Sequence, residues 1–177
     1  MYYQTHFESP LGGITLASDG EHLSGVWLDG QKYFKSTIKE EMHQKGDLPV
    51  LEAAKEWLKL YFEGKRPDAS TLSLAPWGSE FRQEVWRLLL EIPYGQVTTY
   101  GALAAKIAKK RNCASMSAQA IGGAVSHNPI SIIIPCHRVI GTNGSLIGYA
   151  GGIEKKIRLL ELEGVDVRKL SPETALP

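Results

Sequence analysis

The residues best suited to chemistry in this chain are three neighbours, Cys136, His137 and Arg138. A cysteine becomes a strong nucleophile only as the thiolate, so its ordinary pKa of about 8.5 has to fall. An imidazole and a guanidinium can supply the positive charge that lowers it, and no acidic residue lies between positions 92 and 153. The cluster therefore indicates a nucleophilic cysteine. The alternative, from these residues alone, is an inert buried cysteine that packs as a small apolar side chain.

A nucleophilic cysteine also needs a proton acceptor. The apolar run Ile130–Ile134 predicts a buried strand that stops at Pro135 and carries Cys136 at its end. Neighbouring side chains on a strand point to opposite sides, so we expect His137 to act on Cys136 through a turn or a water molecule. Glu163 is the candidate carboxylate that would orient the imidazole. Its alternative is a solvated residue near a helix end.

Metal and cofactor chemistry is not indicated. The chain has two cysteines, Cys113 and Cys136, and five histidines without paired-ligand spacing, so we expect no metal site and no cofactor. Two cysteines do not make a disulfide framework, and neither a signal peptide nor a long apolar stretch is visible. These features predict a cytoplasmic protein that does not contact a membrane. Cys113, next to Asn112, is interpreted as a bystander.

The first part of the chain has the pattern of a small antiparallel sheet with one helix. Three apolar or alternating segments, separated by turn residues, are predicted strands: Tyr2–Ser9, Ile14–Ser18 and Leu23–Leu28. A helix is predicted from about Val50 to Phe62. The segment Asp68–Pro76 has the composition of a linker. We therefore expect an N-terminal α/β support domain at residues 1–75 and a second domain at residues 76–177.

The second part is predicted to be mainly helical. Helices are expected at Ser79–Leu90, Tyr100–Ile107, Ser117–His127 and Ile153–Leu162, with Ser79, Thr99 and Ser117 as N-caps. The two middle helices, joined by a basic turn, are typical of a helix-turn-helix DNA-binding unit of the winged-helix type. The fold class is therefore α/β, or more strictly α+β.

Charge is unequally distributed between the two parts. Residues 1–78 carry eight Lys/Arg and eleven Asp/Glu, a net charge of −3, whereas residues 79–177 carry twelve and eight, a net charge of +4. A basic region without acids suits a surface that faces phosphates. Within it, Gly122 and Gly123 lie inside a predicted helix, where each costs about 1 kcal/mol. They indicate close approach of a backbone or a nucleic acid, or else simple helix packing.

The segment Ile134–Ile140 resembles the active-site signature of the O6-alkylguanine-DNA alkyltransferases. The resemblance extends over nearly all of the second part, at Pro93–Tyr100, Ala120–Ala124, Asn128–Pro129, Gly148–Gly152 and Leu159–Gly164, and the opening Ser9–Gly12 is similar to the start of the family's N-terminal domain. It implies a methyltransferase that acts as a monomer on O6-alkylguanine in double-stranded DNA. The alkyl group would pass irreversibly, once per chain, to a cysteine of the protein. O4-alkylthymine is a second candidate substrate.

The resemblance also implies roles for the matching residues. In catalysis, Cys136 would be the nucleophile, His137 would activate it through a water, Glu163 would orient His137, and Asn128 would brace the turn. At the substrate, Tyr100 would help to flip the nucleotide, backbone groups of Cys136, Val139 and Ala150 would read the base edge, and Lys156 would lie near the pocket. At the DNA, the helix 117–127 would enter the minor groove through Gln119, Ala120, Gly122 and Gly123, with Arg138 as a further contact.

The chain departs from the family at Gln119, where many members carry an arginine that fills the hole left by the flipped base. Glutamine can still donate hydrogen bonds to the orphaned base, but it brings no charge and less stacking surface. We therefore expect weaker DNA binding or less efficient flipping, with the chemistry preserved.

Two other classes of protein fit parts of the pattern. A helix-turn-helix regulator would explain the basic region but leaves Cys136, His137 and Glu163 without a purpose. A Cys–His thiol hydrolase would explain the cysteine and histidine but not the helix-turn-helix pattern, and it predicts repeated turnover. A relative that binds lesions without repairing them would lack the cysteine.

Overall fold

Residues 1–146 and 148–170 are described by the computed structural model, and they form two units. The first unit consists of Met1–Gly78 and Pro129–Ile133, and the second begins at Ser79, leaves out that short segment and resumes at Ile134. The units differ from the expected continuous domains, 1–75 and 76–177, because residues 129–133 return to the first unit. Cys136 therefore follows directly on the point where the chain re-enters the second unit.

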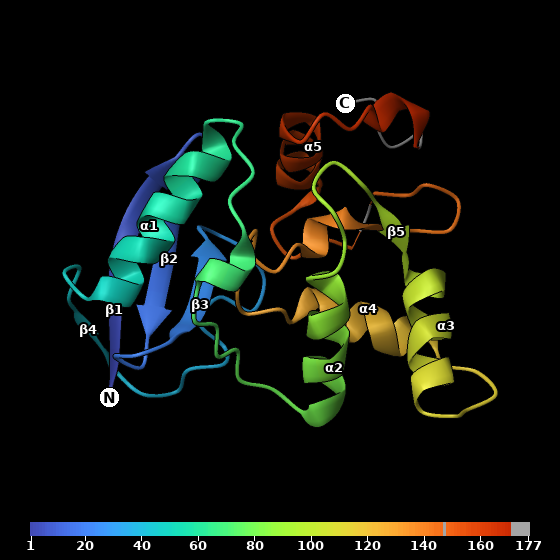
Figure 1. Cartoon of the computed structure of the whole chain (residues 1–177), viewed down its shortest axis with the longest axis horizontal. Coiled ribbons are helices and arrows are strands. Elements are labelled where there is room, and N and C mark those ends of the chain that lie inside the picture. The colour runs from blue at the N-terminus through green and yellow to red at the C-terminus, as the bar shows by residue number, and fades with distance from the viewer. Residues whose placement is uncertain (147, 171–177) are drawn as a thin grey trace. The chain divides into compact units, whose positions relative to one another are not determined.

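A four-stranded sheet of order β3-β2-β1-β4 forms the first unit, and α1 (Pro49–Phe62) lies across one face of it (Figure 1). The strands are β1 (Tyr2–Ser9), β2 (Gly12–Ser18), β3 (Leu23–Leu28) and β4 (Met42–Gln44). The antiparallel pairing of β1, β2 and β3 and the position of α1 confirm the predicted architecture. β4 pairs parallel with β1. Its three residues are too few to show a period in the sequence.

The outer edge of β3 is covered by two returning segments. The amides of Leu23 and Val26 donate to the carbonyls of Ser73 and Pro129, both at 2.8 Å. The predicted strand at residues 130–134 is wrong: only Ile130 forms a bridge, with Val26, and the chain then turns. Ile132 in this turn has a left-handed backbone, with φ of 72°, which is strained for a β-branched residue. An apolar run that is buried but turning has the same sequence pattern as a buried strand.

Four α-helices build most of the second unit: α2 (Glu80–Leu89), α3 (Tyr100–Lys110), α4 (Ala118–Ser126) and α5 (Ile153–Leu162). The three predicted N-caps are confirmed, because the side chains of Ser79, Thr99 and Ser117 each accept a backbone N–H three residues on. α3 is one turn longer than expected, and Lys109 and Lys110 lie in its last turn, where positive charge stabilises a helix. α2 holds α4 in place through Trp86, whose indole N–H donates to the Ala124 carbonyl at 2.8 Å.

The remaining elements of the described residues are two short strands and three 3₁₀ turns. β5 (Thr98–Thr99) pairs parallel with β6 (Val139–Ile140), and the 3₁₀ turns are η1 (Ala69–Thr71), η2 (Cys136–Arg138) and η3 (Val167–Lys169). The β5–β6 pair brings the start of α3 beside the segment that follows Cys136. In the described part of the chain, no helix has both the length and the apolar character needed to cross a membrane.

Candidate active site

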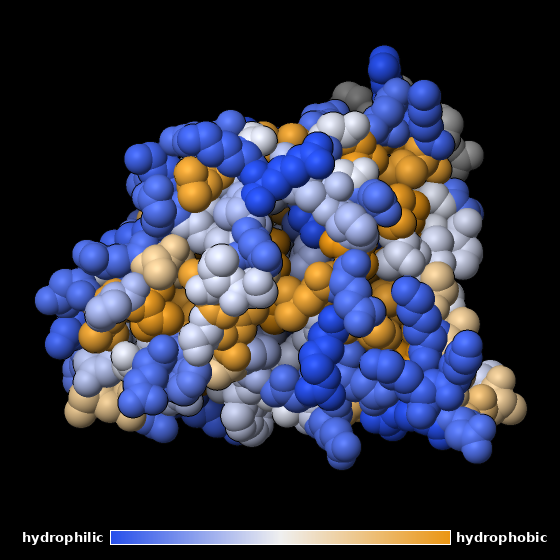
Figure 2. Space-filling view, in the orientation of Figure 1, coloured by the Kyte–Doolittle hydropathy of each residue, from blue (hydrophilic) through white to orange (hydrophobic). Residues whose placement is uncertain are grey.

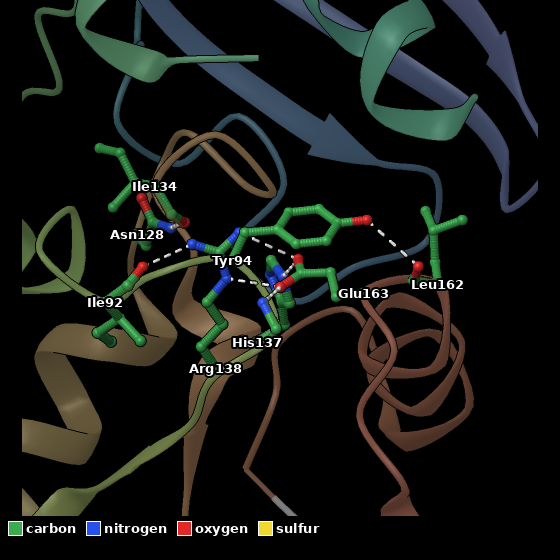
Figure 3. A network of polar contacts seen from close by, with 9 residues as sticks. Ile92, Tyr94, Asn128, Ile134, His137, Arg138, Leu162 and Glu163 are labelled. Carbon is green, nitrogen blue, oxygen red and sulfur yellow. Dashed lines mark hydrogen bonds and ion pairs between the residues drawn. The ribbon is translucent and has the colours of Figure 1, made fainter. Parts of the chain in front are cut away.

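Cys136 is presented by a tight turn around Pro135. The Cys136 amide donates to the Ile134 carbonyl at 2.8 Å, and Pro135 has φ of −83° and ψ of 64°, the values of an inverse γ-turn. The Asn128 side chain donates to the same Ile134 carbonyl at 2.8 Å (Figure 3). Asn128 thus lies where a residue that braces this turn is expected. Cys136 itself begins η2 rather than ending a strand, so the expectation that Cys136 and His137 alternate as on a strand is wrong.

The Cys136 thiol is almost fully buried. Burial raises its pKa, while a hydrogen bond from Asn128 and the nearby charge of Lys156 act in the opposite direction without reversing the shift. Cys136 is therefore a neutral thiol at rest, and the positive charge that favours its thiolate comes from Lys156. This differs from the sequence-based expectation, in which Arg138 supplied part of that charge.

His137 and Glu163 form a buried pair with an Nε2–Oε2 distance of 2.6 Å, and neither side chain is exposed to solvent. Burial lowers the pKa of His137, and the neighbouring Glu163 opposes this only in part. The imidazole is therefore neutral at rest. Because a carboxylate can only accept, the contact assigns the proton to Nε2, and a neutral imidazole of that tautomer takes up a further proton at Nδ1.

The Glu163 carboxylate accepts four hydrogen bonds from His137, Arg138 and Gly95. Besides His137, it accepts from Arg138 Nε at 2.8 Å and Nη2 at 3.1 Å, and from the Gly95 amide at 3.0 Å (Figure 3). Burial alone would raise the pKa of the Glu163 carboxyl, but the hydrogen bonds and charges of His137 and Arg138 hold it well below its usual range. Glu163 is therefore ionised at neutral pH.

Arg138 does not face outward as a DNA contact would. Its guanidinium binds Glu163 through two nitrogens and donates from the third to the Ile92 carbonyl at 2.7 Å, so all three nitrogens are engaged inside the protein. Its central carbon also lies 5.7 Å from the centre of the Tyr94 ring. The geometry contradicts the expectation that Arg138 contacts DNA and makes it part of the His137–Glu163 network.

Gly95 belongs to this site through its backbone, although it has no reactive side chain. Its φ of 77° is left-handed, and a Cβ there would lie 2.9 Å from the Glu163 carbonyl oxygen. Only glycine allows the chain to turn at this point while its amide donates to the Glu163 carboxylate. In the sequence, the residues Pro93-Tyr94-Gly95 predict a turn, but they do not show which residues this turn contacts.

Lys156 is fully buried, and its ammonium donates to the Val139 carbonyl at 2.5 Å. Burial lowers the Lys156 pKa to about 8, and the interaction with Cys136 works against this shift. Lys156 therefore lies close enough to Cys136 for the two charges to interact, whereas the resemblance implies only that it lies near the pocket. Backbone groups of Val139 are expected to read a base edge; its carbonyl already accepts from Lys156 and has one further lone pair available.

Tyr100 lies at the start of α3, close to Gly148: a Cβ on Gly148 would lie 3.0 Å from the Tyr100 hydroxyl. Burial and the neighbouring Cys136 raise the pKa of Tyr100 to about 12, so its hydroxyl keeps its proton and can donate. Tyr149 is buried near Cys136, and among the described residues its hydroxyl has no hydrogen-bond partner. Sequence patterns do not single it out. Ala150, the expected base contact, is half-buried beside it.

α4 presents a small-residue surface to solvent. Gln119 and Ala120 are exposed, and Gly122 and Gly123 are half-buried. A Cβ built on either glycine meets no atom within 4 Å. Packing within the described protein therefore does not require these glycines, and the helix-packing alternative is not supported.

The exposed side of α3 is basic. Lys106, Lys109 and Lys110 all face solvent, and hydrophilic residues dominate the visible surface over α2 and α3 (Figure 2). A cavity of about 460 Å³ lies between α3 and the loop that follows it, lined among others by Ala104, Met116 and the exposed Cys113. Cys136 and its partners do not line this cavity, so it is separate from the candidate site. Within residues 1–146 and 148–170, no cluster of three or more His, Cys, Asp or Glu side chains could hold a metal ion.

Two family models divide the chain between them. Residues 1–76 match the ribonuclease-like domain of 6-O-methylguanine DNA methyltransferases, and residues 80–165 match their DNA-binding domain. The fold and the buried cysteine site thus define a cysteine-dependent DNA methyltransferase. The chain belongs to the family of methylated-DNA–protein-cysteine methyltransferases, because relatives of that name match it over nearly its whole length.

One such relative, from Haemophilus influenzae, is 37% identical over 99% of this chain and 93% of its own length. Another, from Methanosarcina acetivorans, is 43% identical over 93% of this chain and 99% of its own length. Among solved structures, Mycobacterium tuberculosis OGT in complex with DNA is 37% identical, covers 96% of this chain and 98% of that chain, and has a TM-score of 0.76. The fold class and the family expected from the sequence are confirmed.

Proposed function

We propose that this protein repairs DNA by moving the alkyl group of O6-alkylguanine onto Cys136, once per chain and irreversibly. The observation that carries the proposal is the buried Cys136 thiol beside the His137–Glu163 pair, in a chain that belongs to a family of methylated-DNA–protein-cysteine methyltransferases. O4-alkylthymine is a further candidate substrate.

The proton of Cys136 passes to His137 in this proposal. His137 is neutral and its Nε2–H is fixed by Glu163, so Nδ1 accepts the thiol proton through a water molecule, and Glu163 stabilises the imidazolium that forms. Lys156 stabilises the thiolate by its charge. The low pKa of Glu163 means that it does not take the proton itself.

Transfer then breaks one bond and forms another. The thiolate attacks the alkyl carbon, and the carbon–oxygen bond breaks with its electron pair moving to the guanine. The base then takes up one proton, which balances the proton that Cys136 gave to His137, and becomes ordinary guanine. The Tyr100 hydroxyl, which keeps its proton, donates a hydrogen bond to the base. The product is a thioether at Cys136. A thioether is a poor leaving group, so the protein is consumed by the reaction.

The DNA side of the proposal rests on α4 and the basic side of α3. The target base must leave the duplex to reach a buried thiol, at a cost of a few kcal/mol. α4 enters the minor groove, where Gly122 and Gly123 allow the DNA backbone to approach closely and Gln119 occupies the hole that the base leaves. Lys106, Lys109 and Lys110 contribute attraction to phosphates. The first unit serves as a support for the second, and the protein acts as a cytoplasmic monomer.

Mass spectrometry tests the proposal directly. The protein is incubated with a duplex that contains one O6-methylguanine and is then digested. The peptide with Cys136 is expected to gain the mass of one CH₂ group. The peptide with Cys113 serves as an internal control, because this thiol is exposed and lies outside the site. A methyl group on Cys113, or none on either cysteine, would refute the proposal.

A further inference from the structure

Arg138 completes the charge balance of a buried cluster. The side chains of His137 and Glu163 have no exposed surface, and that of Arg138 is only 11% exposed. A carboxylate in such surroundings attracts a proton or a cation strongly, because little water screens it. With His137 as its only charged neighbour, Glu163 would favour the imidazolium. Arg138 supplies a permanent positive charge in its place.

We infer that Arg138 is a positioning residue for the transfer reaction: its guanidinium pairs with Glu163 so that His137 stays neutral at rest and can accept the Cys136 proton. The inference rests on the proposed function and adds a regulator of the proton acceptor in that same site. It also replaces the role in DNA binding that the sequence suggested for Arg138.

The geometry suits this role. Arg138 reaches Glu163 with Nε and Nη2, one to each carboxylate oxygen, at 2.8 and 3.1 Å. Nη1 is anchored on the Ile92 carbonyl at 2.7 Å, and the Tyr94 ring lies beside the guanidinium. Arginine offers this planar fork and never loses its proton. The charge next to Glu163 is therefore fixed in both place and sign.

The other groups around His137 do not duplicate this effect. Among the described residues, the charges that act on His137 are those of Glu163 and Lys156 from the segment of α5 and that of Arg138 from its own turn. The charge of Lys156 also disfavours the imidazolium, but its ammonium donates to the Val139 carbonyl and lies beside Cys136 instead of Glu163. Without Arg138, Glu163 would keep its hydrogen bonds from His137 and the Gly95 amide but would lose the permanent positive charge beside it.

The test compares Arg138→Met, Arg138→Lys and the wild-type protein. Arg168→Met is the matched control, because it removes an exposed arginine that pairs with Asp166 in the same unit. Single-turnover methyl transfer is measured between about pH 5 and pH 8, and the His137 ring is titrated by NMR. In Arg138→Met, we expect the acid limb of the rate profile and the His137 pKa to move up together by about one unit, a tenfold change in proton affinity. Arg138→Lys, which keeps the charge, should restore both toward the wild-type values.

Several outcomes overturn the inference. It fails if Arg138→Met folds, transfers methyl and keeps the wild-type acid limb, or if Arg168→Met shifts the limb equally. If Arg138→Met does not fold, the NMR titration of His137 in the wild-type protein is the test. A His137 pKa above the ordinary value of about 6.5 would then contradict the inference. Failure of the proposed function is distinguishable, since the wild-type protein would then leave Cys136 unmethylated at every pH.

Discussion

Replacement of Gly122 by alanine is expected to stabilise the protein and to weaken its binding to DNA. Gly122 lies inside α4, where glycine is less favourable than alanine by about 1 kcal/mol. The added methyl group meets no atom of the described protein within 4 Å, so no clash offsets this gain. The melting temperature should therefore rise by about 2–4 °C for a chain of this size. Gly123→Ala should behave in the same way, because the space around its Cβ is equally open.

The same methyl group occupies space that we assign to the DNA backbone. Forcing one methylene into a close contact costs about 1–3 kcal/mol, so the Kd for a duplex should rise roughly tenfold or more. Fluorescence anisotropy with a labelled O6-methylguanine duplex measures this change. The slope of log Kd against log salt concentration should stay the same, because no charge is altered. That slope is the internal control for an effect of shape alone.

A variant that is more stable but binds duplex DNA more weakly indicates that glycine at this position serves DNA binding and not the fold. If Gly122→Ala and Gly123→Ala both stabilise the fold but leave the Kd unchanged, α4 does not meet DNA through this face. If both destabilise the fold, α4 is packed more tightly than the structure indicates.

Four further changes have defined outcomes. Glu163→Gln should slow methyl transfer by about 10²-fold or more, because an amide stabilises the His137 imidazolium poorly. Single-turnover rates measure this loss, and duplex affinity measured in parallel should stay unchanged. Gly95→Ala should lower the free energy of unfolding by about 1–3 kcal/mol in denaturant titrations, since the new Cβ is strained by its φ of 77° and lies 2.9 Å from the Glu163 carbonyl; wild-type stability would contradict the turn geometry. The pKa of Lys156 is about 8 in the folded protein and 10.5 ordinarily, so the unfolded state binds more protons between these pH values. The free energy of unfolding of the wild-type protein should therefore rise with pH through this range, by about 3 kcal/mol relative to Lys156→Met. Parallel pH profiles of stability for the two proteins would argue against a buried ammonium. Gln119→Arg should tighten duplex binding in the same anisotropy assay, and unchanged or weaker binding counts against the assigned place of Gln119.

Local signals in the sequence predict the elements of the fold well. Ser79, Thr99 and Ser117 mark three helix starts that the structure confirms as N-caps. Each depends on a hydrogen bond between residues three positions apart, so the chain nearby contains all the information needed. The apolar run at residues 130–134 is the counterexample. Burial makes it look like a strand, but tertiary contacts decide that it turns after Ile130.

The site could be predicted only as far as its residue types allowed. Cys136, His137 and Glu163 were identifiable from chemistry and from the family resemblance, and the structure brings the last two within 2.6 Å of each other. Arg138 could not be placed, because the direction of a guanidinium depends on Ile92 and Glu163, which are distant in sequence. Gly95 contributes a hydrogen bond from its backbone amide, and a contact of this kind cannot be predicted from the residue type.

The stoichiometry of repair tests most directly whether Cys136 is consumed by the transfer. A fixed amount of protein is titrated with an excess of O6-methylguanine duplex, and the restored guanine is counted. Repair is expected to stop at one lesion per chain, and Cys136→Ser is expected to repair none while it still binds the duplex. Continued turnover by the wild-type protein, or repair by Cys136→Ser, would contradict the proposed transfer to Cys136.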